Sequence, residues 1–146
     1  MSPFEDLIHE LSKMMGIPLH VDNHQSCLIS FLDVGVAVQI DLDTHADRIL
    51  LGTQLGRLTP GIYRERLFME AMRSNGTAKT LKGILAFSEK NDTLILFQFL
   101  NIAWVSGDKL YAFLQLFKEQ AMLWKEALER GEIPPIVVEV EESKIR

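Results

Sequence analysis

Residues 52–59 of the chain could bind a phosphate group. They read Gly-Thr-Gln-Leu-Gly-Arg-Leu-Thr, whereas a nucleotide-binding phosphate loop reads Gly-x-x-x-x-Gly-Lys-Ser/Thr. The spacing from Gly52 to Gly56 is one residue short, and Arg57 stands in place of the lysine. A helix must also begin at such a loop, but a proline-containing stretch follows here. The pattern therefore favours backbone roles, with Gly52 allowing another segment to approach a strand closely and Gly56 and Gly61 permitting turns.

Two groups of acidic and histidine side chains could bind a metal ion. The first resembles the start of a calcium loop: Asp41, Asp43, His45 and Asp47. That loop requires glycine at its sixth position and glutamate at its twelfth, but counted from Asp41 these positions hold Ala46 and Gly52. The second group surrounds a cysteine: His20, Asp22, His24 and Cys27. It has none of the Cys/His spacings of structural zinc sites. We predict polar surface turns here, and assign no metal and no cofactor.

Cys27 is the only cysteine in the sequence, and it would need an adjacent base to act as a nucleophile. It alternates in phase with Ile29 and Phe31, as a small buried side chain on a strand does. The chain contains no Gly-x-Ser-x-Gly motif, and no pair of carboxylates stands out in an apolar stretch. The sequence therefore predicts a protein that is not an enzyme.

The composition predicts a soluble domain in a reducing compartment. The chain has 146 residues, 47% of them hydrophobic, which suits one domain with its own core. Its 20 acidic and 15 basic side chains give a net charge of −5, whereas nucleic-acid-binding proteins usually show a basic excess. The N-terminus lacks the basic segment of a signal peptide, and the apolar run 94–105 is too short to span a bilayer. We expect a cytoplasmic protein that binds no nucleic acid and does not insert into membranes.

The elements around these residues are predicted from periodicity. Helices are expected at 3–15, from Thr59-Pro60 to Asn75-Gly76, and from Ser106 or Asp108 to about Arg130. Strands are expected at 19–21, 27–32, 34–43, 49–55, 81–87 and 93–100. The result is an α+β fold, a single domain with a mainly antiparallel sheet and three helices in the order α-βββ(β)-α-ββ-α. We assign residues 1–131 to this domain and residues 132–146 to a charged C-terminal tail that either adds an edge strand or stays mobile.

Apolar residues exceed what these elements need for one simple core. Both faces of the expected strand 94–100 are apolar, so both must be covered. Helices of the same chain or a second subunit could provide that cover. The expected helix 3–15 carries a broad apolar face that includes Met14 and Met15, and methionine suits surfaces that accept varied partners. Such a stripe is also ordinary core in many helices.

Several motifs, in this order, resemble those of one family. They are the opening amphipathic helix that ends at glycine, then CLISFLD, RILLGTQLGRLTP, MEAMRSNG and TLILFQFL, and an aromatic pattern from Phe117 to Trp124. Together with the element order, the size and the acidity, they are similar to the class I chaperones of bacterial type III secretion, the Tir chaperone and YopE chaperone type. The resemblance covers about residues 2–130, and Met69 and Met72 stand where leucine is more usual.

The resemblance implies a homodimeric, ATP-independent cytoplasmic chaperone. Such a protein would bind an extended N-terminal segment of one or more secreted effectors and keep it competent for export, with the secretion ATPase as a further partner. The implied effector contacts lie on the first helix and first strands: Leu7, Leu11, Leu19, Val21, Ile29 and Phe31. The implied dimer interface lies on the second helix: Tyr63, Leu67, Phe68 and Met72. Core packing could explain each of the effector contacts equally well.

Two other functions fit the same residues. One is a ligand-binding or enzymatic α+β domain with a pocket between the sheet and the long helix, where His20, Asp22 and Arg57 would converge. A deep pocket with perturbed titrating groups would favour it. The other is a structural subunit whose apolar surface matches one fixed partner.

Overall fold

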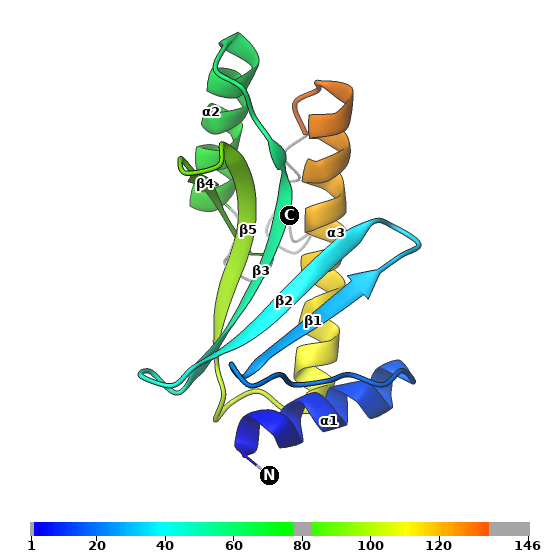
Figure 1. Cartoon of the computed structure of the whole chain (residues 1–146). Helices are drawn as coiled ribbons and strands as arrows, with labels where there is room; N and C mark the ends of the chain where they lie inside the picture. The colour runs from blue at the N-terminus through cyan, green and yellow to red at the C-terminus, as the bar shows by residue number, and fades with distance from the viewer. Residues whose placement is uncertain (1, 78–82, 135–146) are drawn as a thin grey trace, which may run out of the picture.

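The computed structural model describes residues 2–77 and 83–134 and confirms the α+β class and the predicted element order (Figure 1). Its helices are α1 (Pro3–Met15), α2 (Ile62–Thr77) and α3 (Gly107–Arg130). Its strands are β1 (Ser26–Phe31), β2 (Val36–Asp43), β3 (Arg48–Arg57), β4 (Ile84–Ser88) and β5 (Thr93–Asn101). Most of the predicted tail, residues 135–146, lies outside the described residues.

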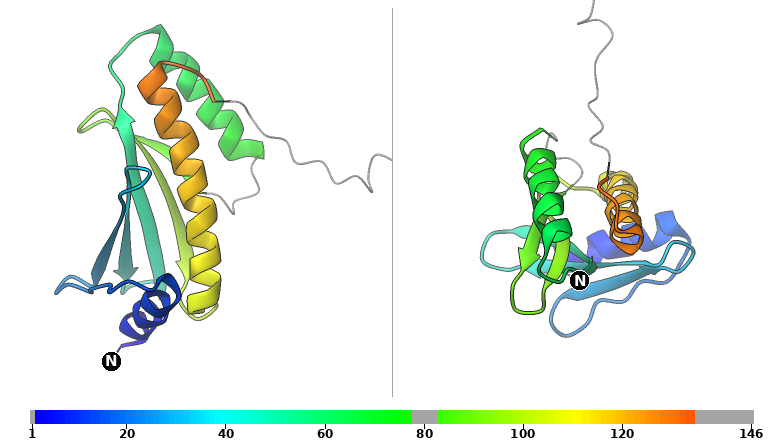
Figure 2. Two further views of the ribbon diagram at one scale, coloured as in Figure 1. Left: turned by 90° about the vertical axis from the view of Figure 1, so that its right-hand side faces the viewer. Right: turned by 90° about the horizontal axis from the view of Figure 1, so that it is seen from above.

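The five strands form one antiparallel sheet in the order β1-β2-β3-β5-β4. Helix α3 packs on β2 and β3, α1 packs on α3, and α2 packs on β4. Figure 2 shows the long helices on one side of the sheet, and Figure 1 shows the sheet in front of α3. Within the described ranges, no helix covers the opposite face, so one layer of helices lies against one layer of strands.

The core lies between the sheet and the helices and follows the predicted periodicities. Alternate residues of β2 (Val36, Val38 and Ile40) are buried, because successive side chains of a strand point to opposite faces. Phe4 and Phe117, from α1 and α3, are fully buried in the same core. Two features stabilise helix α1. Its buried residues share one stripe, and the Ser2 hydroxyl caps the helix by accepting a hydrogen bond from the Glu5 N–H at 3.1 Å.

Four local predictions are wrong. Residues 19–21 are irregular rather than a strand, although Leu19 and Val21 still pack on the core. Helix α2 continues through Asn75-Gly76 to Thr77, so the expected left-handed end is absent there. A Cβ atom added at Gly52 would meet nothing within 4 Å in the described structure, so no segment approaches this glycine closely. Gly56 lies inside β3 at an irregularity in the pairing with β5, not in a turn.

Gly83 is the glycine whose replacement should matter most for folding. Its φ is +100°, and an added Cβ would lie 2.9 Å from side-chain carbons of Leu96. We expect Gly83→Ala to destabilise the protein by roughly 1–3 kcal/mol, because it adds a methyl group to a packed core in a backbone conformation that alanine disfavours. Urea unfolding measures the change. Gly52→Ala is the matched control and should change the free energy of unfolding little, because its Cβ meets open space.

Candidate functional site

The polar candidates do not assemble into a reaction centre. In the part of the chain that the structure describes, no group of three or more His, Cys, Asp and Glu side chains could hold a metal ion. Cys27 is buried, and this burial raises the pKa of its thiol. The raised pKa favours the protonated thiol, which is a weaker nucleophile than the thiolate. His20 and Asp22 line a shallow groove beside α1, but Arg57 does not line that groove. The structure thus gives no support to the predicted convergence of these three residues.

The residues implied as effector contacts fall into two sets. Leu7, Leu11 and Ile29 are buried in the core of the chain itself. Leu19, Val21 and Phe31 are partly buried and pack against that core from outside. Leu19 and Val21 also line the groove beside α1. The first set therefore lies in the core beneath this surface, and the second set is accessible enough for a partner to contact.

Strand β1 is one edge of the sheet, and part of its backbone has no partner in the described structure. The Leu42 N–H donates to the carbonyl of Gln25, the residue just before β1. Because backbone groups alternate in direction along an antiparallel strand, the odd-numbered residues of β1 bond to β2 and the even-numbered residues direct their N–H and carbonyl groups away from the sheet. At Ser26 the outward groups are satisfied, because its N–H donates to Asp22 Oδ1 at 3.0 Å and its carbonyl accepts from the Asp22 N–H at 2.9 Å. Leu28 and Ser30 have no such bonds, so they form an open edge for about four backbone hydrogen bonds.

A second surface is the sheet face opposite the helices, which we call the open sheet face. Its large apolar side chains include Leu28, Leu50, Ile95, Phe97 and Phe99. They line a groove of about 580 Å³. Leu28 is 64% exposed. The apolar residues on both faces of β5 were the sequence signal for this surface. Leu94 and Leu96 point inward and are buried in the core, whereas the outward Ile95, Phe97 and Phe99 are not buried.

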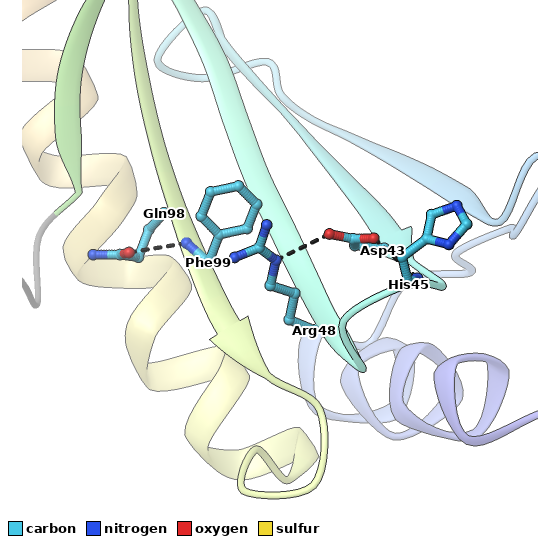
Figure 3. A network of polar contacts seen from close by, with 5 residues as sticks. All are labelled: Asp43, His45, Arg48, Gln98 and Phe99. Carbon is cyan, nitrogen blue, oxygen red and sulfur yellow. Dashed lines mark hydrogen bonds and ion pairs between the residues drawn. The ribbon is translucent and has the colours of Figure 1, made fainter.

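Arg48 packs on the aromatic residue at one end of the open sheet face. The guanidinium of Arg48 lies 3.8 Å from the centre of the Phe99 ring and its Nε donates to the Asp43 carboxylate at 3.0 Å. Figure 3 shows Arg48 between the Phe99 ring and Asp43. This hydrogen bond, helped by the backbone N–H of His45, lowers the pKa of Asp43. Phe99 in turn packs edge-on against Phe97, with the ring centres 5.9 Å apart, so the guanidinium and the two rings form one packed cluster.

The groove extends over the point where β2 and β3 separate. Their pairing stops at Gln39 and Gly52, and beyond this point the Thr53 hydroxyl bridges to the Ala37 carbonyl at 2.7 Å. Lys125 of α3 reaches the Gly35 carbonyl at the same opening. Ala37 of β2 and Gly52 of β3 line the groove here.

The third surface is the exposed side of α2. Of the residues implied at the dimer interface, Leu67 is buried in the chain's own core and Met72 is 74% exposed. Phe68 packs on Phe87 with ring centres 4.9 Å apart, and the Tyr63 hydroxyl is 2.8 Å from the Glu132 carbonyl. Three apolar residues lie on one stripe in the exposed part of the helix, which we call the α2 stripe: Ile62, Met69 and Met72. Ile62 and Met69 were not among the residues implied at the dimer interface, because helical spacing does not say which of two apolar stripes faces inward.

None of the described helices is both long and apolar enough to cross a membrane. This agrees with the interrupted apolar run in the sequence.

Comparison with known proteins gives consistent results. The model of the Tir chaperone protein (CesT) family matches residues 6–125. No curated protein sequence matches the chain. Among solved structures, the "HopA1-SchA Chaperone-Effector Complex" superposes with a TM-score of 0.70 at 21% identity, covering 86% of this chain and 94% of the other.

Two further solved structures share this fold. The Yersinia pestis type III secretion chaperone SycH, in complex with a fragment of YscM2, gives a TM-score of 0.66 at 17% identity, with 81% and 96% of the two chains covered. YbjN from E. coli, described as a putative transcription regulator, gives 0.61 at 20% identity, with 90% and 96% covered. At these identities the superpositions show a shared fold, and the match to the family model identifies the family.

Proposed function

The chain belongs to the Tir chaperone protein (CesT) family, and we propose that it is a type III secretion chaperone that binds secreted effector proteins. It holds an extended N-terminal segment of the effector and keeps that segment competent for export, without ATP and without a catalytic step. The protein acts in the bacterial cytoplasm, where it meets effectors before secretion. We assign residues 1–131 to the chaperone domain and residues 132–146 to its charged C-terminal tail.

The open β1 edge is the observation that carries this proposal. An extended segment that adds to a sheet edge gains backbone hydrogen bonds, and pockets for its alternate side chains provide selectivity. Leu28 and Ser30 offer these backbone groups, and Leu28 also continues into the open sheet face. Each apolar side chain that the segment buries contributes about 1.5–3 kcal/mol, which offsets about 1–2 kcal/mol for ordering each residue.

The groove beside α1 extends the same binding site. It borders the irregular residues 19–25, so a strand on β1 would continue past Leu19 and Val21. Phe31 lies at the other end of β1, where the Lys118 ammonium is 4.8 Å from its ring. We assign these three residues direct contact with the effector, and assign Leu7, Leu11 and Ile29 the role of supporting them from the core.

We also propose a homodimer that forms through α2. Met72 and its neighbours in the α2 stripe would contact the second copy, and Tyr63 and Phe68 would lie at the margin of the interface. Leu67 would hold the helix on its own domain. Exposed apolar stripes of this kind on a soluble protein commonly mark an interface.

Capture of the natural partner tests the proposed function. The tagged protein is purified gently from its native cytoplasm, and the polypeptides that accompany it are identified by mass spectrometry and limited proteolysis. We expect a stoichiometric secreted protein that is protected from protease near its N-terminus. Recovery of a bound metabolite with no polypeptide would contradict the proposal and support a ligand-binding domain.

A further inference from the structure

The sheet has two edge strands, β1 and β4. Within residues 2–77 and 83–134, two successive outward residues with unpaired backbone groups are found on β1, at Leu28 and Ser30. Strand β4 is the edge opposite β1. Its pairing with β5 joins Leu85 to Leu96 and Ile84 to Phe97. The N–H and carbonyl of Leu85 both bond to a side chain of α2. Since outward and inward residues alternate along an antiparallel edge strand, Leu85 and Phe87 carry the outward backbone groups of this short strand.

A side chain from α2 takes both outward groups of Leu85. The Leu85 N–H donates to Asn75 Oδ1 at 2.9 Å, and Asn75 Nδ2 donates to the Leu85 carbonyl at 2.9 Å. A primary amide presents one acceptor and two donors, so this pair of bonds imitates the pairing that a neighbouring strand would make. Asn75 thereby occupies the edge as one residue of an added strand would.

The continuation of α2 past the expected end explains how Asn75 reaches this position. The Asn-Gly pair predicted a left-handed helix end, but the helix runs on to Thr77. The Asn75 side chain therefore projects from the last turn of α2, and α2 packs on β4. The Phe68–Phe87 contact and the Arg64 guanidinium, 4.7 Å from the Phe87 ring, hold the two elements together.

We propose that Asn75 closes the β4 edge to strand addition, so that an extended polypeptide pairs with this sheet only at β1. The inference rests on the proposed function, because it determines where the effector segment can bind. It also concerns the free protein. If both edges were open, β1 of one copy could pair with β4 of the next, and such a head-to-tail contact does not close and grows into chains.

The test uses the free full-length protein and the variant Asn75→Ala. We expect the Leu85 amide to exchange with solvent about tenfold faster, since it loses a hydrogen bond. We also expect species larger than those of the wild type in sedimentation velocity, increasing with concentration. Ser30→Pro in the same chain removes an outward N–H of β1, and should return the size distribution to that of the wild type. Asn101→Ala, at an asparagine whose side chain accepts from the Ala103 N–H of a loop, is the control.

Two results would overturn the inference. One is a folded Asn75→Ala protein with faster Leu85 exchange and an unchanged size distribution. The other is association that Ser30→Pro does not suppress. If Asn75→Ala fails to fold, Asn75→Asp carries the test, because it keeps an acceptor for the Leu85 N–H and loses the donor to the Leu85 carbonyl. A wild type that captures no secreted polypeptide would contradict the proposed function, whereas these measurements need no effector and would still decide the role of Asn75.

Discussion

Ser30→Pro is expected to weaken effector binding roughly 10- to 100-fold while the chain stays folded. Ser30 is exposed, and its N–H faces away from β2, so proline removes no bond of the sheet itself and is tolerated on such an edge. An incoming strand loses one hydrogen bond and meets the proline ring where its own carbonyl would lie. One to two hydrogen bonds of about 1.4 kcal/mol each correspond to this range.

Calorimetry with the effector segment recovered by co-purification measures this effect. Ser30→Ala changes the same side chain but keeps the N–H, so its dissociation constant should match the wild type. Circular dichroism and thermal unfolding establish that both variants are folded. Unchanged affinity in folded Ser30→Pro would show that the effector does not pair with β1, and would direct the search to the open sheet face.

The elements that sequence predicted well are those with signals inside the element. Helices α1 and α3 are capped at their N-termini by Ser2 and Ser106, whose hydroxyls accept the expected hydrogen bonds. Helix α3 is capped at its C-terminus by the left-handed Gly131. Strand β2 alternates without interruption. In each case the capping residue or the periodicity is local, so the rest of the fold was not needed to interpret it.

The candidate site was predicted less completely because it depends on tertiary arrangement. Leu67 and Met72 are both apolar residues of one helix, yet the first is buried and the second is 74% exposed. The spacing of apolar residues in the sequence does not distinguish these two side chains. Their difference in burial depends on how α2 docks on β4. Asn75 shows the same limit, because its local pattern predicts a helix end, whereas its bonds to Leu85 depend on a strand ten positions further along the chain.

Charges on the α2 stripe are expected to separate the dimer. Met69 and Met72 are 57% and 74% exposed in the single chain, so replacing both with glutamate leaves the core intact and keeps good helix formers. In a two-fold interface each substitution acts twice, and burying unpaired charges is costly. The dimer dissociation constant should rise at least about 100-fold, equivalent to about 2.7 kcal/mol, as measured by sedimentation equilibrium.

The choice of positions makes the dimer test specific for α2. Leu67→Glu would unfold the domain, because this side chain is buried in its own core, and monomers produced that way would say nothing about the interface. Met14→Glu places the same charge on an exposed methionine of α1 and should leave the dimer unchanged. A wild type that sediments as a monomer, or a Met69→Glu/Met72→Glu protein that remains dimeric, would exclude the α2 stripe as the interface. Dissociation without loss of thermal stability would instead identify the exposed methionines as interface residues, distinct from the core leucine one turn away.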